Sequence, residues 1–238
     1  MNRPSIVHLK VWGDYACITR PELKAERVSY PMLTPSAARG VLEAIFYEPQ
    51  MYYIVHEIAV LNPVRWVSFR RNEVKKVVSG KEAARAAAGL AVLEPIHSGA
   101  GSENCTQRGT LALVDVAYLI TAEIQLSLRA QPPRDTLTKY HDLFQGRAAK
   151  GKCFHRPYLG CREFAADFEP AKPNDFTRLD PTTFPDQDLG VMLYDVFPPG
   201  LRPAGDSVPA APVFFHARVR GSRLDCHPDR VHFLNQRP

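Results

Sequence analysis

The residue types best suited to chemistry gather in residues 134–163. Lys139 and His141 stand two positions apart, and His155 follows a basic run. Histidine transfers protons near neutral pH because its ordinary pKa is about 6.5, and a lysine ammonium stabilises negative charge that develops on a phosphate. The segment holds seven Lys or Arg against three Asp or Glu. These groups predict binding of a polyanion and proton transfer on it, and a nucleic-acid backbone is the first partner to consider.

Lys139 and His141 have side chains that suit metal-free cleavage of RNA. In that reaction the 2′-hydroxyl loses its proton, the charge on the phosphate is stabilised, and the leaving 5′-oxygen gains a proton. DNA lacks the 2′-hydroxyl, so this chemistry predicts selectivity for RNA. The alternative is a solvated helix face, which a Lys and a His on a helix form more often.

Further residues fit contacts to RNA. Basic side chains bind phosphates, while aromatic rings and imidazoles stack on unpaired bases. The phosphate-binding candidates are Arg147, Lys150, Lys152, Arg156 and Arg162, and the stacking candidates are Phe154, His155 and Tyr158. A second basic strip contains Arg65, Arg70, Arg71, Lys75 and Lys76. The alternatives are a solvated surface for the charges and packing against a sheet for the rings.

Composition narrows the class of protein. The chain has 238 residues, a formal charge of +5 and a pI of about 9.0, which suits phosphate partners and fits one sizeable domain, with or without a small appendage. No apolar run approaches the roughly 20 residues that cross a bilayer, and the N-terminus lacks the apolar core of a secretory signal. The five cysteines are odd in number and irregularly spaced, which argues against a disulfide framework. We expect a cytoplasmic protein without a membrane partner.

Motifs for cofactor chemistry are missing from the sequence. There is no GxxxxGK[ST] loop, which argues against an NTPase. Cys153 and Cys161 are too far apart for the paired ligands of a structural zinc site, and the carboxylates show no spacing typical of a two-metal nuclease. We therefore expect no cofactor and no metal.

Hydrophobic patterns predict the elements that position these residues. Strands are expected over residues 6–11, 51–60 and 64–71, and the apolar even positions of residues 112–128 predict a long strand with one buried face. Thr34 and Pro35 begin a helix that Pro49 ends, and a second helix is expected over residues 137–149. The remaining expectations are a hairpin insertion at 72–108 with an Ala-rich piece at 83–88, a strand or loop at 153–168, and strands at 190–196 and 213–219.

This order predicts an α+β fold. Residues 1–170 are expected to form a ferredoxin-like (RRM-like) βαββαβ domain that carries the long hairpin insertion. Residues 171–238 are expected to form a small, proline-rich antiparallel β appendage. Many RNA-binding modules share the βαββαβ plan, but unrelated proteins use it too, so it supports RNA binding by analogy only.

Four blocks of sequence resemble one known family. They are residues 11–16 (VWGDYA), 39–45 (RGVLEAI), 113–118 (LVDVAY) and 154–164 (FHRPYLGCREF), of which the last is the most specific. On these blocks the chain resembles, across nearly its whole length, the CRISPR-associated Cas-five family in its subtype I-C form. The resemblance implies an enzyme that cuts the precursor CRISPR transcript within its repeat without a metal. It also implies that the protein stays on the 5′ handle, with the other Cas subunits of the surveillance complex as partners.

The resemblance also implies a catalytic group, formed by a Tyr at the end of the first helix and a Lys-His pair at the start of the second. The family Lys falls on Lys139. The family His falls on Tyr140, with His141 one place later, and the family Tyr falls on Phe46, with Tyr47 one place later. Either the local register slides by one residue or the site is rearranged.

The candidate catalytic residues are therefore Lys139, His141, Tyr140 and Tyr47. The leading hypothesis is a metal-independent endoribonuclease. The first alternative is an RNA-binding subunit that caps the 5′ handle and does not cut. A stand-alone RRM-like regulator is the second alternative.

Overall fold

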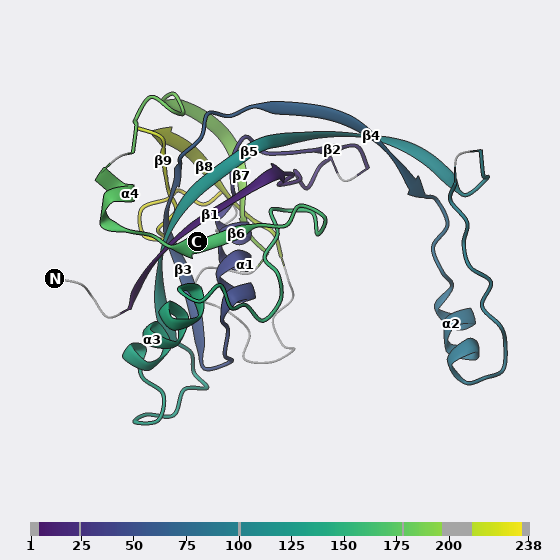
Figure 1. Ribbon diagram of the computed structural model, residues 1–238, viewed down its shortest axis with the longest axis horizontal. Coiled ribbons are helices and arrows are strands. Elements are labelled where there is room, and N and C mark those ends of the chain that lie inside the picture. Colours follow the sequence, from purple (N-terminus) through teal and green to yellow (C-terminus); the bar gives the residue numbers. More distant parts are fainter. Residues whose placement is uncertain (1–4, 24, 100, 178, 197–210, 235–238) are drawn as a thin grey trace.

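Nine strands and four helices make up the described part of this computed structural model, which covers residues 5–23, 25–99, 101–177, 179–196 and 211–234 (Figure 1). The strands are β1 (Ile6–Ala16), β2 (Arg27–Val28), β3 (Met51–Val60), β4 (Trp66–Val74), β5 (Cys105–Leu126), β6 (Asp167–Pro170), β7 (Gln187–Asp195), β8 (Val213–Arg220) and β9 (Arg223–Asp225). The helices are α1 (Pro35–Ile45), α2 (Gly80–Ala87), α3 (Leu137–Ala148) and α4 (Pro173–Thr177).

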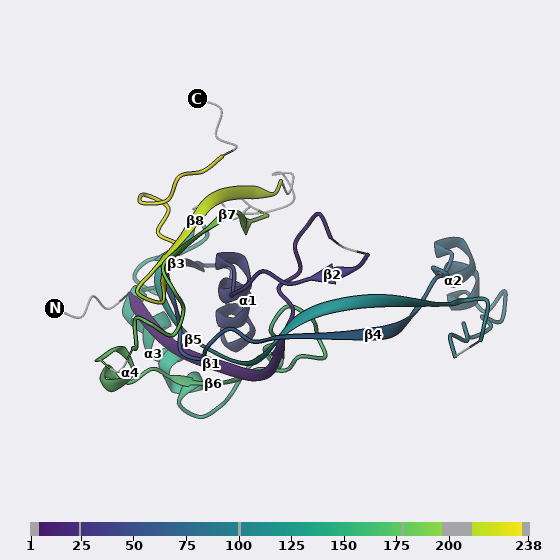
Figure 2. The same ribbon diagram turned by 90° about the horizontal axis from the view of Figure 1, so that it is seen from above.

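These strands belong to one sheet, whose main path runs β6-β1-β5-β3-β9-β8-β7. Strands β2 and β4 pair with β5 off this path, and β2 is the strand that pairs in parallel. The sheet curls around α1, so that β7 and β8 lie on one side of the helix and β1, β5 and β6 on the other (Figure 2). The expected mixed fold of helices and an antiparallel sheet is confirmed.

Helix α1 begins where the sequence predicts. The hydroxyl of Thr34 accepts a hydrogen bond from the Ala37 N–H at 3.3 Å, and Pro35 occupies the first helical position. Four of the residues buried along the helix lie at helical spacing, Ala38, Val41, Leu42 and Ile45, and Pro35 and Ala44 are buried as well. On another face, Arg39 forms two hydrogen bonds of 2.8 Å with Asp195 at the end of β7. This ion pair fixes α1 against the far side of the curled sheet.

Helix α3 packs through one stripe of large side chains. Tyr140, Phe144 and Ala148 are buried at a spacing of four residues. The ring of Phe144 lies 5.8 Å from that of Tyr53 on β3. The hydroxyl of Thr136 caps the helix by accepting from the Lys139 N–H. The expected second helix is confirmed, with its start set by this cap.

The hairpin of β4 and β5 leaves the body of the protein as a long arm with α2 at its far end (Figures 1 and 2). Its strands pair from Trp66 with Leu113 to Val74 with Cys105. The expected hairpin insertion is therefore confirmed, and α2 covers most of the Ala-rich piece. Strand β4 begins at Trp66, two residues later than expected. None of the residues of α2 is buried.

The long strand departs from the expected single buried face. Leu113, Ala117 and Leu119 are buried as well as most of the even positions, so apolar side chains are covered on both faces. Val114 and Leu126, which were expected on the buried face, are only half-buried. Asp115 has a φ of 54°, a left-handed conformation that interrupts the alternation within β5. Leu128 is 99% exposed because the strand ends at Leu126, so its predicted burial is wrong.

The C-terminal strands extend the same sheet. Strand β9 pairs with β3, and the expected strands at 190–196 and 213–219 correspond to β7 and β8. The segment at 153–168 is mostly loop, ending in β6. Much of the proline-rich stretch, 197–210, lies outside the described residues, and the division into domains at residue 170 stays a prediction. No helix in the described ranges is long and apolar enough to span a membrane.

Candidate active site at the junction of α1 and α3

The C-terminal end of α1 lies against the middle of α3. The ring of Phe46, the residue after α1, lies 6.2 Å from the ring of Tyr140. The guanidinium of Arg147 lies 5.6 Å from the same Phe46 ring. The Phe46 carbonyl accepts a 2.9 Å hydrogen bond from the hydroxyl of Tyr53. These contacts hold the chain that leads into Tyr47 beside α3.

Asp135 is a central residue of this junction that the sequence analysis missed. It is 5% exposed and accepts hydrogen bonds from the Tyr140 hydroxyl at 2.6 Å and the Gln131 N–H at 2.9 Å. The Tyr140 bond, with the Gln131 and Lys139 bonds, lowers the pKa of Asp135 to about 2. Burial, with the Asp135 hydrogen bond, raises the pKa of Tyr140 to about 12. The four-residue spacing from Asp135 to Lys139 is the sequence signal that points to it.

Lys139 and His141 have different neighbours. Lys139 Nζ lies 3.3 Å from Asp135 Oδ1 and 5.1 Å from the centre of the Tyr140 ring. His141 Nδ1 lies 3.2 Å from an oxygen of Asp142. The pKa of His8 on β1 is lowered, first by burial and then by the charge of His141, because the two imidazoles are near each other. Because residues two apart on a helix do not face each other, these contacts do not bring the two side chains together.

The two tyrosines differ in access. Tyr47 is 41% exposed, whereas Tyr140 is 2% exposed and its hydroxyl already donates to Asp135. Phe46 is also buried. Tyr47 is therefore open to solvent at this end of α1, whereas the hydroxyl of Tyr140 holds Asp135 in place.

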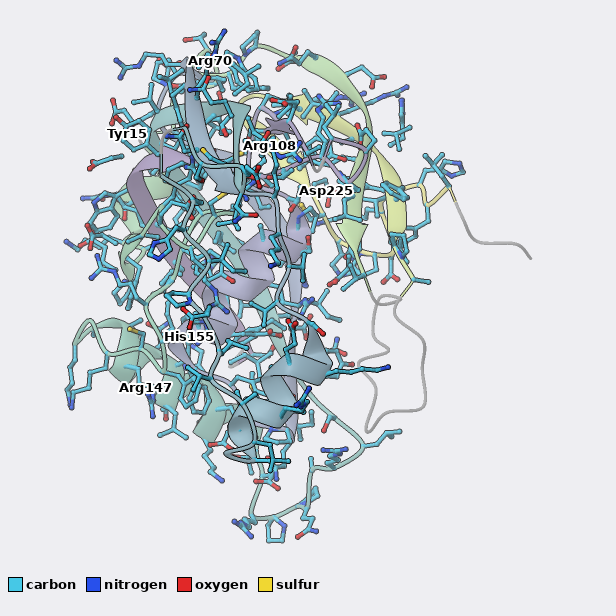
Figure 3. All side chains as sticks on the ribbon, turned by 90° about the vertical axis from the view of Figure 1, so that its right-hand side faces the viewer. Tyr15, Arg70, Arg108, Arg147, His155 and Asp225 are labelled. Carbon is cyan, nitrogen blue, oxygen red and sulfur yellow. The ribbon has the colours of Figure 1, made fainter. Side chains whose placement is uncertain are left out.

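The loop that carries the most specific sequence block rests on α1. The N–H groups of Phe154 and His155 donate to the carbonyl of Ala44 at 2.8 and 3.3 Å, which satisfies a carbonyl of the last helical turn. His155 and Arg147 lie on the same side of the molecule, although they come from this loop and from α3 (Figure 3). His155 is thus tied to the same end of α1 as Tyr47.

A cavity of about 340 Å³ opens between this loop and α1. His155 and Tyr158 line one wall, and Gly40 and Ala44 line the helix side. A Cβ on Gly40 would meet no atom within 4 Å, so this side of the helix is open. The volume lies within the range of about 300–1,000 Å³ typical of small-ligand pockets.

The predicted phosphate-binding residues fall into two groups. Lys150, Lys152 and Arg162 are exposed near the loop, and Arg156 pairs with Asp167. Arg70, exposed on the arm, lies at the opposite end of the view from Arg147 (Figure 3).

Arg71 differs from its neighbour Arg70. It pairs with Glu163 and stacks on the rings of Phe69 and Phe164, at 4.9 and 5.0 Å. This arginine therefore joins the arm to the loop through contacts within the protein.

Comparison with known proteins identifies the family. A family model described as CRISPR-associated protein (Cas_Cas5) matches residues 6–227. The chain belongs to the CRISPR-associated Cas5 family. The matching model is that of Cas5d, the type I-C Cas5, so the resemblance drawn from the four sequence blocks is confirmed.

Two relatives in this family carry the name CRISPR pre-crRNA endoribonuclease Cas5d. The protein from Mannheimia succiniciproducens is 39% identical over 232 residues, which cover 93% of this chain and 95% of the relative. The protein from Thermus thermophilus is 42% identical over 244 residues, which cover 95% of this chain and 93% of the relative. A solved structure of a CRISPR-associated protein matches with a TM-score of 0.62 and 19% identity, covering 92% of this chain and 90% of that one. That structure supports the fold.

Proposed function

We propose that this chain is an endoribonuclease that binds the precursor CRISPR transcript and cuts it within the repeat. It then stays on the 5′ handle as a subunit of the type I-C surveillance complex. The observation that carries the proposal is the pair of relatives named as pre-crRNA endoribonucleases, each matched over more than nine-tenths of both chains. The exposed Lys139, Tyr47 and His155 around the end of α1 supply groups that suit the chemistry.

In the proposed mechanism the 2′-hydroxyl of the repeat attacks the adjacent phosphate, and no metal takes part. Lys139 stabilises the charge of the transition state, held in place by Asp135. Tyr47 donates a hydrogen bond to a reacting oxygen. A histidine transfers the proton. His141 is the candidate that sequence favours, and His155 is a second candidate because its backbone is fixed to the end of α1.

The loop and the cavity account for RNA binding in this proposal. His155 and Tyr158 stack on an unpaired base that enters the cavity, and base stacking of this kind contributes about 1–3 kcal/mol per base. Phosphates follow the basic residues near the loop, which are the half-buried Arg147 and the exposed Lys150, Lys152, Arg156 and Arg162. Arg70 contacts RNA farther out, along the arm.

We also propose that β1, α1, β3, β5, α3 and β6 form a ferredoxin-like unit. The strand order β6-β1-β5-β3, with antiparallel neighbours throughout, supports this assignment. A right-handed crossover through each of α1 and α3 is the arrangement that such a unit requires.

The alternative is a subunit that binds the handle without cutting. It is favoured by the burial of Phe46 and Tyr140, which occupy the family's catalytic positions. In that case the RNA contacts are the same and the proton-transfer step is absent.

The test is an assay of purified protein with end-labelled repeat RNA in EDTA. We expect a product with a 2′,3′-cyclic phosphate, and a repeat with a 2′-deoxy nucleotide at the cut position should bind without being cut. Lys139→Ala should lower the single-turnover rate by about 10²-fold or more. Lys150→Ala changes a lysine just past the other end of α3, and this variant should cut normally once saturated. His141→Ala and His155→Ala decide which imidazole transfers the proton.

Other outcomes contradict the proposal in distinct ways. Tight repeat binding with no product under any condition would establish the non-cleaving alternative. Full activity of Lys139→Ala would remove that residue from the mechanism. Repeat RNA that binds no better than a random single strand would favour the stand-alone regulator.

A further inference from the structure

Cys17 and Cys161 form a second chemical site, apart from the junction. Both residues belong to one small buried cluster with Ala112 and Phe164, although they are 144 positions apart in sequence (161 minus 17). The Cys17 N–H also donates to the Leu159 carbonyl at 3.0 Å. Gly160 has a φ of +89°, and a Cβ there would lie 1.9 Å from the Cys17 carbonyl oxygen. The backbones of the two segments therefore lie in contact, which brings the two cysteines side by side in this cluster.

The charges around the pair favour ionisation of one sulfur. Arg27 donates a hydrogen bond to Cys161 Sγ at 3.7 Å. The hydrogen bond from Cys17 and the charges of Arg27 and Arg71 lower the pKa of Cys161, against the effect of burial. The same hydrogen bond, together with burial, raises the pKa of Cys17. These contacts favour the thiolate form at Cys161 over that at Cys17.

Solvent exposure also favours Cys161 over Cys17 as the reactive residue. Cys161 is 9% exposed, so a molecule as small as a peroxide can reach it, whereas Cys17 is fully buried. The guanidinium of Arg27 also pairs with the carboxylates of Glu73 and Glu163, at 3.1 and 3.8 Å. It keeps its hydrogen bond to Cys161 Sγ beside these two ion pairs. A slightly exposed cysteine beside an arginine, with a second, buried cysteine behind it, is the arrangement of reactive and resolving cysteines.

We propose that Cys161 is a peroxide-reactive thiolate and that Cys17 resolves it, so that mild oxidation links the end of β1 to the loop through a disulfide. The Cys161 thiolate attacks hydrogen peroxide, an S–O bond forms, the O–O bond breaks and hydroxide leaves. Peroxide is thereby reduced and the sulfur becomes a sulfenic acid. The Cys17 sulfur then attacks the oxidised sulfur, and the sulfenic oxygen leaves with the Cys17 proton as water.

The remaining cysteines provide internal controls. Cys226 is fully buried, and burial raises the pKa of its thiol. Cys105 and Cys153 are half-buried, on the arm and beside α3. Oxidation by a small amount of peroxide should therefore consume Cys161 and Cys17 and leave the other three cysteines to an alkylating agent.

The test treats the reduced full chain with equimolar hydrogen peroxide, alkylates the remaining thiols, and maps unreduced peptides by mass spectrometry. We expect a peptide pair joined through Cys17 and Cys161, lighter by two hydrogens and separated by dithiothreitol. Cys17→Ser should give no cross-link and a Cys161 sulfenic acid that dimedone traps. Arg27→Gln should slow alkylation of Cys161 at pH 7 roughly threefold or more, and Cys153→Ser should change nothing.

Cross-linking of wild-type protein alone decides the proposal if a variant fails to fold. Oxidation spread evenly over all five cysteines would overturn it, as would a sulfinic acid at Cys161 with Cys17 still reduced. Neither cysteine belongs to the junction, so these outcomes do not depend on whether the protein cuts RNA.

Discussion

The hydroxyl of Tyr140 donates a 2.6 Å hydrogen bond to Asp135, and this bond joins the packed core to the candidate site. On one side, the Tyr140 ring lies against Phe46 at the end of α1. On the other side, Asp135 lies 3.3 Å from the ammonium of Lys139. The position of Lys139 therefore depends on how α1 and α3 pack.

Asp135→Asn should change how stability depends on pH. A carboxylate whose folded pKa is about 2 stabilises the fold above its ordinary pKa of about 3.9, and this contribution disappears as pH falls from about 4 to 2. The variant should be less stable than wild type at pH 7 and should lose less stability across that window. Urea unfolding at pH 7, 4 and 2 measures the stability at neutral pH and its loss at low pH. Asp142→Asn, at an exposed residue of α3, is the control. Equal pH slopes in wild type and Asp135→Asn would contradict the assignment.

Tyr47→Phe should lower the cleavage rate by about tenfold, because one hydrogen bond of roughly 1.4 kcal/mol to a reacting oxygen is lost. The exposed ring should leave the free energy of unfolding nearly unchanged. Phe46→Tyr is the matched reverse change, and its new hydroxyl would be buried against Tyr140. That variant should lose stability without gaining activity. A faster Phe46→Tyr enzyme would show instead that position 46 faces the RNA.

Gly40→Ala should stabilise the protein by roughly 0.5–1 kcal/mol, because alanine favours a helix and the new methyl group meets no atom within 4 Å. Gly40→Leu should fill part of the cavity and weaken binding of repeat RNA by about tenfold, the loss of one stacked base. Gly146→Ala on α3 is the control, because its Cβ position is also open but it does not line the cavity. Thermal unfolding and filter binding measure the two effects separately. Undiminished RNA binding by Gly40→Leu would remove the cavity from the interface.

Arg70→Ala and Arg71→Ala should separate RNA contact from structure on the arm. Arg70 is exposed, so its loss should leave stability within about 0.5 kcal/mol and reduce the salt dependence of RNA binding by about one phosphate contact. Arg71 pairs with Glu163 and stacks on two phenylalanine rings, so its loss should destabilise the fold by roughly 1–2 kcal/mol. RNA binding measured across a salt series checks the change in salt dependence, and urea unfolding checks the change in stability. An unchanged salt slope in Arg70→Ala would place the RNA elsewhere.

Local signals in the sequence predicted much of this fold. Thr34 and Pro35 mark the start of α1 because a cap and a fixed φ act within a few residues. The burial of Leu119 was not predictable from alternation, because it depends on what covers the second face of the sheet. The shared cluster of Cys17 and Cys161 was equally hidden, since only folding brings the loop to the end of β1.

The residues of the candidate site also divide into those that the sequence predicted and those that it did not. Sequence predicted Lys139, His141 and Tyr47 from residue type and resemblance, and their catalytic roles stay predictions. It did not predict that Tyr140 is buried, because the helical period alone does not say which stripe of α3 meets α1. Asp135 acquires its importance from that burial.

Strand β5 belongs to both the arm and the body of the protein. Its second half is clamped between β1 and β3, and its first half reaches out with β4 as the arm. Asp115, with its left-handed φ, stands at the point of support, where Asn62 bonds its carbonyl and Arg65 pairs with its carboxylate. A movement of the tip of the arm would therefore be passed along β5 to Asp115 and into the part of the sheet formed with β1 and β3, because the strand is continuous between the arm and the body.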